Sequence, residues 1–81
     1  MGMLRVLSRH GDEHITWDEQ KFHTNDPEAI AAIHEAERIF ARSRAKGATA
    51  FRVEAGKPVQ KIGQFDPTAP QILIVPRVVG G

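Results

Sequence analysis

The residues from Asp26 to Gly47 carry helix start and stop signals at their two ends and a helical pattern between them. Asp26 can accept hydrogen bonds from free backbone amides as the N-cap residue, and Pro27 suits the first helical position. Gly47 offers the left-handed conformation that commonly follows a helix. Between these ends apolar residues recur at intervals of three and four: Ala29, Ile30, Ile33, Ala36, Ile39 and Phe40. The sequence therefore predicts one helix from about Pro27 to Lys46, with one face packed on a sheet.

The segments on both sides of this helix alternate between apolar and polar residues, as strands do. Four of them predict two hairpins, with residues 3–9 and 14–17 before the helix and residues 49–54 and 59–65 after it. The intervening segment 18–25 is polar apart from Phe22, so we expect a loop whose aromatic ring packs under the helix.

The last predicted strand, from Gln71 to Val75, is apolar at four consecutive positions. Such a strand is usually central in its sheet and often parallel to a neighbour. Pro76 then ends the pairing because it has no amide to donate. The element order ββαβββ predicts an α+β protein with the β-grasp fold, a mixed sheet of four to five strands packed on one helix. A ferredoxin-like fold without its second helix is the alternative, but the proline-rich segment 66–70 disfavours a hidden helix.

Composition restricts the size of the domain and the kind of partner. The 81 residues, 41% of them hydrophobic, allow one small domain, which we assign to residues 1–75 with a flexible tail at 76–81. The net charge of +1 gives no electrostatic reason to expect binding to nucleic acid or to a membrane surface. The chain has no cysteine and therefore no disulfide framework. We expect a cytoplasmic monomer whose partners are proteins. Met1-Gly2 is interpreted either as a native start or as a cloning remnant before Met3.

Side chains that could carry catalysis are few, and each has a structural explanation. They are His10, His14, His23 and His34, and the carboxylate pairs Asp12-Glu13 and Asp18-Glu19. The histidines are scattered, with no thiolate to complete a metal site, and polar turns commonly contain paired carboxylates. Trp17 and Phe22 are expected to pack rather than to stack on a ligand. The sequence therefore predicts a protein that is not an enzyme, with no catalytic residue, metal or bound cofactor.

The chain ends on Gly80-Gly81. Glycine has no Cβ, so this end can pass through a channel too narrow for other residues, and the Gly81 carboxylate is a candidate reactive group. A linker remnant or a frayed end is the alternative interpretation.

In element order the whole chain resembles the ubiquitin-like β-grasp proteins, and its end is similar to that of their bacterial sulfur-carrier branch. The small subunit of molybdopterin synthase finishes with a hydrophobic strand, a proline and an apolar residue before Gly-Gly, much like residues 72–81 here. Arg77 falls where ubiquitin has an arginine in its own tail. The long helix, Thr16-Trp17-Asp18 and Phe65-Asp66-Pro67 depart from the sulfur carriers and look more like divergent bacterial ubiquitin-like proteins.

The resemblance implies a protein modifier. An activating enzyme would use ATP and Mg²⁺ to adenylate the Gly81 carboxylate, which would pass through a thioester to a lysine, with a conjugating enzyme and a metalloprotease as further partners. Pro76, Arg77, Val78 and Val79 would contact the activating enzyme, with Arg77 against an acidic patch. A sulfur carrier that forms a C-terminal thiocarboxylate, and a non-covalent β-grasp binding module of the phage or assembly type, remain as alternatives.

Two further sets of residues belong to this expected function. One helix cannot cover both faces of a sheet, so Phe51, Val53 and Ile62 form a candidate recognition surface whose exposure depends on strand register. Four lysines could accept the modifier if it forms chains: Lys21, Lys46, Lys57 and Lys61.

Overall fold

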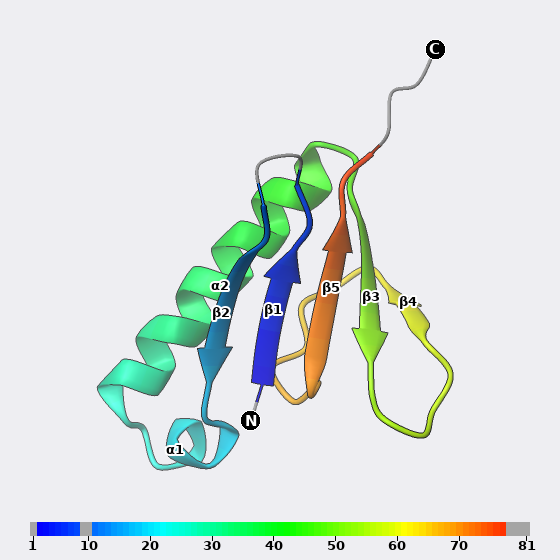
Figure 1. Ribbon diagram of the computed structural model, residues 1–81. Coiled ribbons are helices and arrows are strands. Elements are labelled where there is room, and N and C mark those ends of the chain that lie inside the picture. The colour runs from blue at the N-terminus through cyan, green and yellow to red at the C-terminus, as the bar shows by residue number, and fades with distance from the viewer. Residues whose placement is uncertain (1, 9–10, 78–81) are drawn as a thin grey trace.

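The computed structural model describes residues 2–8 and 11–77 and contains a sheet, one long helix and one short helix (Figure 1). The elements follow one another as β1 (Gly2–Val6), β2 (Glu13–Trp17), α1 (Glu19–His23), α2 (Pro27–Ala45), β3 (Thr49–Val53), β4 (Gln60–Ile62) and β5 (Gln71–Val75).

The strands form one five-stranded mixed sheet in the order β2-β1-β5-β3-β4. β1 pairs with β2 in antiparallel fashion and with β5 in parallel, and β3 is antiparallel to both β5 and β4. The last strand of the chain is thus central and lies parallel to the first, as the four consecutive apolar residues predicted. The molecule is an α+β domain with the predicted β-grasp layout.

α2 begins and ends close to the predicted residues because its capping groups are local. The Asp26 carboxylate accepts a hydrogen bond from the backbone N of Ala29 at 3.1 Å, and Pro27 occupies the first turn. Lys46 is the C-cap residue, and Gly47 follows with φ at 90°. The predicted apolar stripe faces the sheet, with Ala29, Ile33, Ala36, Ile39 and Phe40 all buried.

The core lies between α2 and one face of the sheet. Leu4, Ile72 and Ile74 are its largest fully buried side chains, and Leu4 stands beside Ile72 across the parallel β1–β5 pair. Phe65, in the loop after β4, packs against both Trp17 and Phe40, with ring centroids 5.6 Å from Trp17 and 5.9 Å from Phe40. Central strands and helix therefore share one apolar layer.

The structure corrects the prediction of a loop at 18–25, because α1 occupies Glu19–His23. Asp18 starts this helix by accepting a hydrogen bond from the backbone N of Gln20 at 3.0 Å. Phe22 was expected to pack its ring under the long helix, but its side chain lies outside those that the structure describes. β4 is also shorter than predicted, three residues instead of seven, and β1 begins at Gly2, which is a buried strand residue.

Candidate functional site

The end of β5 sets where the chain leaves the sheet. Val75 pairs with Thr49 of β3, and on the other side the backbone N of Leu7 donates to the carbonyl oxygen of Ile74 at 3.0 Å. Pro76 and Arg77 follow and are both exposed. The remaining predicted tail residues, Val78, Val79, Gly80 and Gly81, lie outside the described part of the chain. The strand that leads into the tail is therefore held by hydrogen bonds on both sides almost to its end.

The Arg77 side chain lies beside Gly47, the glycine that follows the C-cap residue of α2. A Cβ placed on Gly47 would lie 3.1 Å from Cδ of Arg77, which is closer than most such contacts allow. Gly47 thus has two functions, since it takes the left-handed conformation after α2 and leaves room for Arg77. The helix stop signal was visible in the sequence, whereas the approach of Arg77 was not.

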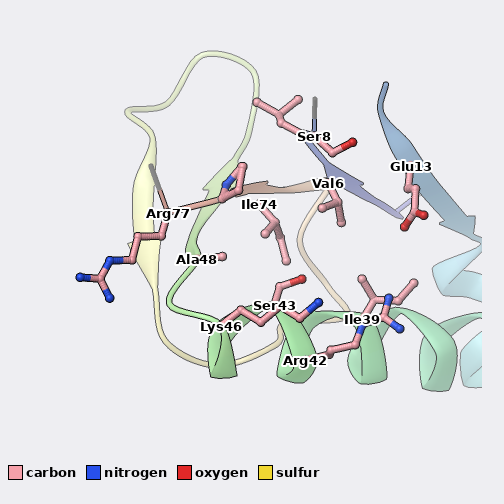
Figure 2. A pocket seen from close by; sticks show the side chains of 12 residues that line it. Val6, Ser8, Glu13, Ile39, Arg42, Ser43, Lys46, Ala48, Ile74 and Arg77 are labelled. Carbon is pink, nitrogen blue, oxygen red and sulfur yellow. The ribbon is translucent and has the colours of Figure 1, made fainter. Parts of the chain in front are cut away.

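Beside Pro76 and Arg77 lies a cleft of about 430 Å³, which we call the tail-base cleft (Figure 2). It is lined by Val6, Leu7, Ser8, Glu13, Ile39, Arg42, Ser43, Lys46, Ala48, Ile74, Pro76 and Arg77. Figure 2 shows α2 forming one wall with Arg42, Ser43 and Lys46, while the β1–β2 end forms the opposite wall with Ser8 and Glu13. The guanidinium of Arg77 extends outward, away from the other lining side chains. Sequence reasoning missed this cleft, because its walls come from four separate elements.

Charge is distributed unevenly along α2. Glu28, Glu35 and Glu37 occupy its first two thirds, and Arg38, Arg42, Arg44 and then Lys46 follow. Arg38 is neutralised by Glu35, with Nη2 and Oε1 2.7 Å apart, and Arg44 donates from Nη1 to the carbonyl oxygen of Ala48 at 3.0 Å. Within residues 2–8 and 11–77, neither Arg42 nor Lys46 forms an ion pair. The end of α2 next to the tail therefore carries uncompensated positive charge.

The sheet face opposite α2 is the outer face. Buried Ala50 and Ile72 point to the core, so their neighbours Phe51 and Leu73 point the other way. Strand register places one residue of each strand in a single row across this face, in the order His14, Arg5, Leu73, Phe51 and Lys61. Neither described helix covers this row (Figure 1).

The predicted recognition surface is divided between the two faces of the sheet. Phe51 and Val53 lie on the outer face and are half-buried. Ile62, whose exposure the sequence left to the strand register, lies on the inner face, since it pairs with fully buried Ala50 and packs against the core. Leu73, which the sequence did not single out, stands beside Phe51 and extends this apolar surface across β5.

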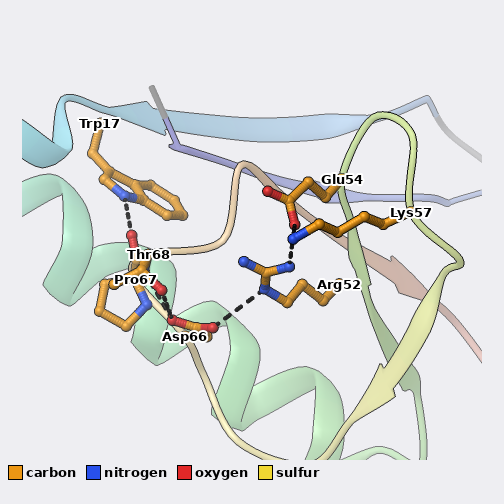
Figure 3. Close-up of polar contacts among 7 residues, drawn as sticks. All are labelled: Trp17, Arg52, Glu54, Lys57, Asp66, Pro67 and Thr68. Carbon is orange, nitrogen blue, oxygen red and sulfur yellow. Dashed lines mark hydrogen bonds and ion pairs between the residues drawn. The ribbon is translucent and has the colours of Figure 1, made fainter.

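A cluster of charged side chains lies at the C-terminal end of β3, around Arg52 (Figure 3). Arg52 donates from Nη1 to the Glu54 carboxylate at 2.9 Å, and its Nε lies 3.4 Å from the Asp66 carboxylate. Asp66 also accepts from the hydroxyl and the backbone N of Thr68, at 2.6 and 2.9 Å, and the hydroxyl bond is the main cause of its lowered pKa. Lys57 completes the cluster, 3.4 Å from Glu54. These contacts join β3 to the loop before β5 and have a structural role.

The four predicted acceptor lysines, Lys21, Lys46, Lys57 and Lys61, are all exposed. They lie apart from one another, on α1, after α2, in the β3–β4 loop and on β4. Lys57 is engaged by Glu54, and Lys46 lines the tail-base cleft. All four side chains are therefore accessible to solvent.

The described residues contain no group of three or more histidine, cysteine or acidic side chains placed to hold a metal ion. A search of the same residues finds no helix with the length and apolar character needed to cross a bilayer. Comparison of the chain with protein-family models, curated protein sequences and solved structures gives no significant match.

Proposed function

We propose that this protein is a ubiquitin-like modifier whose Gly81 carboxylate is adenylated by an activating enzyme and transferred through a thioester to a lysine of a target protein. The observation that supports this function best is the position of β5. It is the central strand, paired with both β1 and β3, and it runs directly into exposed Pro76 and Arg77. Such a strand would give a C-terminal tail a rigid base from which to extend.

The proposed chemistry explains why the domain needs no catalytic side chain. A free carboxylate is a poor acyl donor, so the activating enzyme would let it attack the α-phosphate of ATP and release pyrophosphate. A cysteine thiolate of that enzyme would displace AMP from the adenylate, and a lysine amine would then displace the thiolate to form an isopeptide bond. ATP and Mg²⁺ would be bound by the enzyme, in the cytoplasm. The domain would supply the acyl group and the surfaces by which it is recognised.

Two surfaces are proposed for recognition. Pro76 and Arg77, with Val78 and Val79, would meet the activating enzyme at the base of the tail. On the outer face, Phe51, Val53 and Leu73 would offer apolar contacts to a conjugating enzyme, to a metalloprotease or to a reader of the modification. Lys21, Lys46, Lys57 and Lys61 would accept further copies if chains form.

A trypsin digest provides a direct test, because Arg77 is the last tryptic site before Gly81. The tagged protein is expressed in cells of its source, and its conjugates are purified under denaturing conditions and digested. We expect target lysines to carry the remnant Val-Val-Gly-Gly. The matched control is the same protein without Gly81, which should give no such remnant.

The intact mass of the unconjugated protein from the same cells separates the alternatives. A C-terminus in which sulfur replaces one carboxylate oxygen, without lysine remnants, would identify a sulfur carrier and contradict the modifier. A terminus other than Gly81, or an unmodified Gly81 with no conjugates, would contradict both and favour a non-covalent module. Purified activating enzyme with ATP and Mg²⁺ should reproduce the positive result in vitro.

A further inference from the structure

We infer that the tail-base cleft is a docking site for a partner segment in which an apolar side chain stands next to carboxylates, and that this segment belongs to the activating enzyme. The assignment to that enzyme rests on the proposed function. The binding chemistry of the cleft rests only on its own residues.

The inner part of the cleft is apolar. It is lined by Val6 of β1, Ile39 of α2, Ile74 of β5, and Ala48 between α2 and β3. Ile39 is 8% exposed and Ile74 only 1%, so these side chains are fixed by the core and form the floor of the cleft, and half-buried Val6 is the more accessible apolar side chain. A space of about 430 Å³ is suited to one or two side chains and is too small for a packed helix. The apolar component of the partner is thus limited to one or two aliphatic or aromatic side chains.

The rim selects the charge of the partner. Two cations, Arg42 and Lys46, line the cleft against one carboxylate, Glu13, while the guanidinium of Arg77 extends outward from its edge. Arg42 and Lys46 are four residues apart on one side of α2, and both are exposed. The whole chain has a net charge of only +1, so this local excess is a feature of one end of the molecule. A partner with carboxylates beside its apolar anchor is therefore favoured over a neutral or basic one.

The position of the cleft connects docking with delivery of the tail. Pro76 and Arg77 line the cleft, and the Arg77 side chain lies beside Gly47. A segment seated between α2 and β1 would consequently lie beside the point where the chain leaves the sheet. The cleft would place the tail relative to a partner before the tail itself is bound.

The test uses the full chain labelled for NMR and a synthetic peptide of alternating glutamate and leucine, blocked at both ends. We expect shifts of the Val6, Ile39, Ala48 and Ile74 methyl signals, with binding that weakens as salt is added. The matched peptide with lysine in place of glutamate should bind more weakly. Equal binding of the two peptides, or shifts confined to Phe51 and Leu73 on the outer face, would overturn the inference.

Charge variants test the rim directly. Arg42→Glu with Lys46→Glu should weaken the acidic peptide about tenfold or more, whereas Glu13→Gln should strengthen binding. Arg38→Glu is the matched control, because Arg38 lies on the same helix but pairs with Glu35 outside the cleft. An effect of Arg38→Glu as large as that of the double variant would show a non-specific charge effect and contradict the site.

Deletion of Gly81 distinguishes failure of this inference from failure of the proposed function. The deletion should leave peptide binding unchanged while it abolishes conjugation. If the intact protein forms no conjugates yet still binds the peptide, the proposed function fails and the docking site stands. With the purified activating enzyme, the double variant should raise KM and leave kcat nearly unchanged. An unchanged KM would contradict the assignment of the cleft to that enzyme.

Discussion

The indole Nε1 of Trp17 donates a hydrogen bond to the carbonyl oxygen of Pro67, 3.0 Å away. This bond joins the end of edge strand β2 to the loop that precedes central strand β5, across 50 residues of sequence. Trp17 is buried, and its ring also contacts Phe65 in the same loop. β2 ends at the end of the sheet opposite to the one where β5 ends, so the indole closes the end away from the tail (Figure 1).

Replacement of this indole should be costly even when the aromatic ring is kept. Trp17→Phe removes the donor to Pro67 and leaves unfilled space, so the free energy of unfolding should fall by about 1–3 kcal/mol. Urea denaturation followed by circular dichroism measures the change. Thr16→Ala, at an exposed position of the same strand, should stay within about 0.5 kcal/mol of the wild type. Equal effects of the two substitutions would refute the role of the indole.

Gly2 is predicted to be sensitive to any added side chain. A Cβ at this position would collide with Cε2 and Nε1 of the Trp17 indole, so Gly2→Ala must displace the ring. We expect a loss of about 1–3 kcal/mol in thermal or chemical unfolding. Gly63→Ala is the control, since no atom lies within 4 Å of its added Cβ. A Gly2→Ala protein as stable as the Gly63→Ala protein would show that β1 does not depend on this contact.

Asp66 should make stability depend on pH in the acid range. Hydrogen bonds from Thr68 and the nearby charge of Arg52 lower the pKa of Asp66 in the folded protein. A lowered folded-state pKa contributes stability above the unfolded value of about 3.9, and that stability is lost as the pH falls through the folded value. Unfolding free energies measured from neutral pH to about pH 2 should therefore decline less steeply for Asp66→Asn than for the wild type. Parallel curves for the two proteins would contradict this.

Two neighbouring residues of β5 test which face of the sheet is covered. Ile72 is fully buried against α2, and Ile72→Ala should cost about 2–5 kcal/mol. Leu73 is half-buried on the outer face, so Leu73→Ala should cost only about 1 kcal/mol. Both changes are measured by the same denaturation experiment. A large loss for Leu73→Ala would mean that another part of the molecule packs on the outer face.

Residues with local signals were predicted well. Asp26 and Pro27 placed the start of α2, and Gly47 placed its end, because capping depends on neighbours in the sequence. The apolar residues of β5 predicted both its bounds and its central position. α1 was missed because it is one short turn of mostly polar residues with no apolar period to detect, although Asp18 gave a usable N-cap signal.

The recognition surface could be predicted only in part, and the charged cleft was not predicted. Phe51 and Val53 were correctly considered for the outer face, but Ile62 was not separable from them without the β3–β4 register. In the same way, Arg77 was noticed for its place in the tail, while the cleft beside it was not foreseen.

Sequence signals confined to a few residues were thus sufficient to predict the two ends of α2 and the central position of β5, and to draw attention to the Gly-Gly tail. Two properties depended on packing between distant segments. Strand pairing selects the face to which Phe51 and Ile62 point, because a shift of one residue would reverse every side chain. The packing of α2 against the ends of β1 and β5 forms the tail-base cleft and places Arg42 and Lys46 beside Pro76 and Arg77, because only the folded core holds these two segments together.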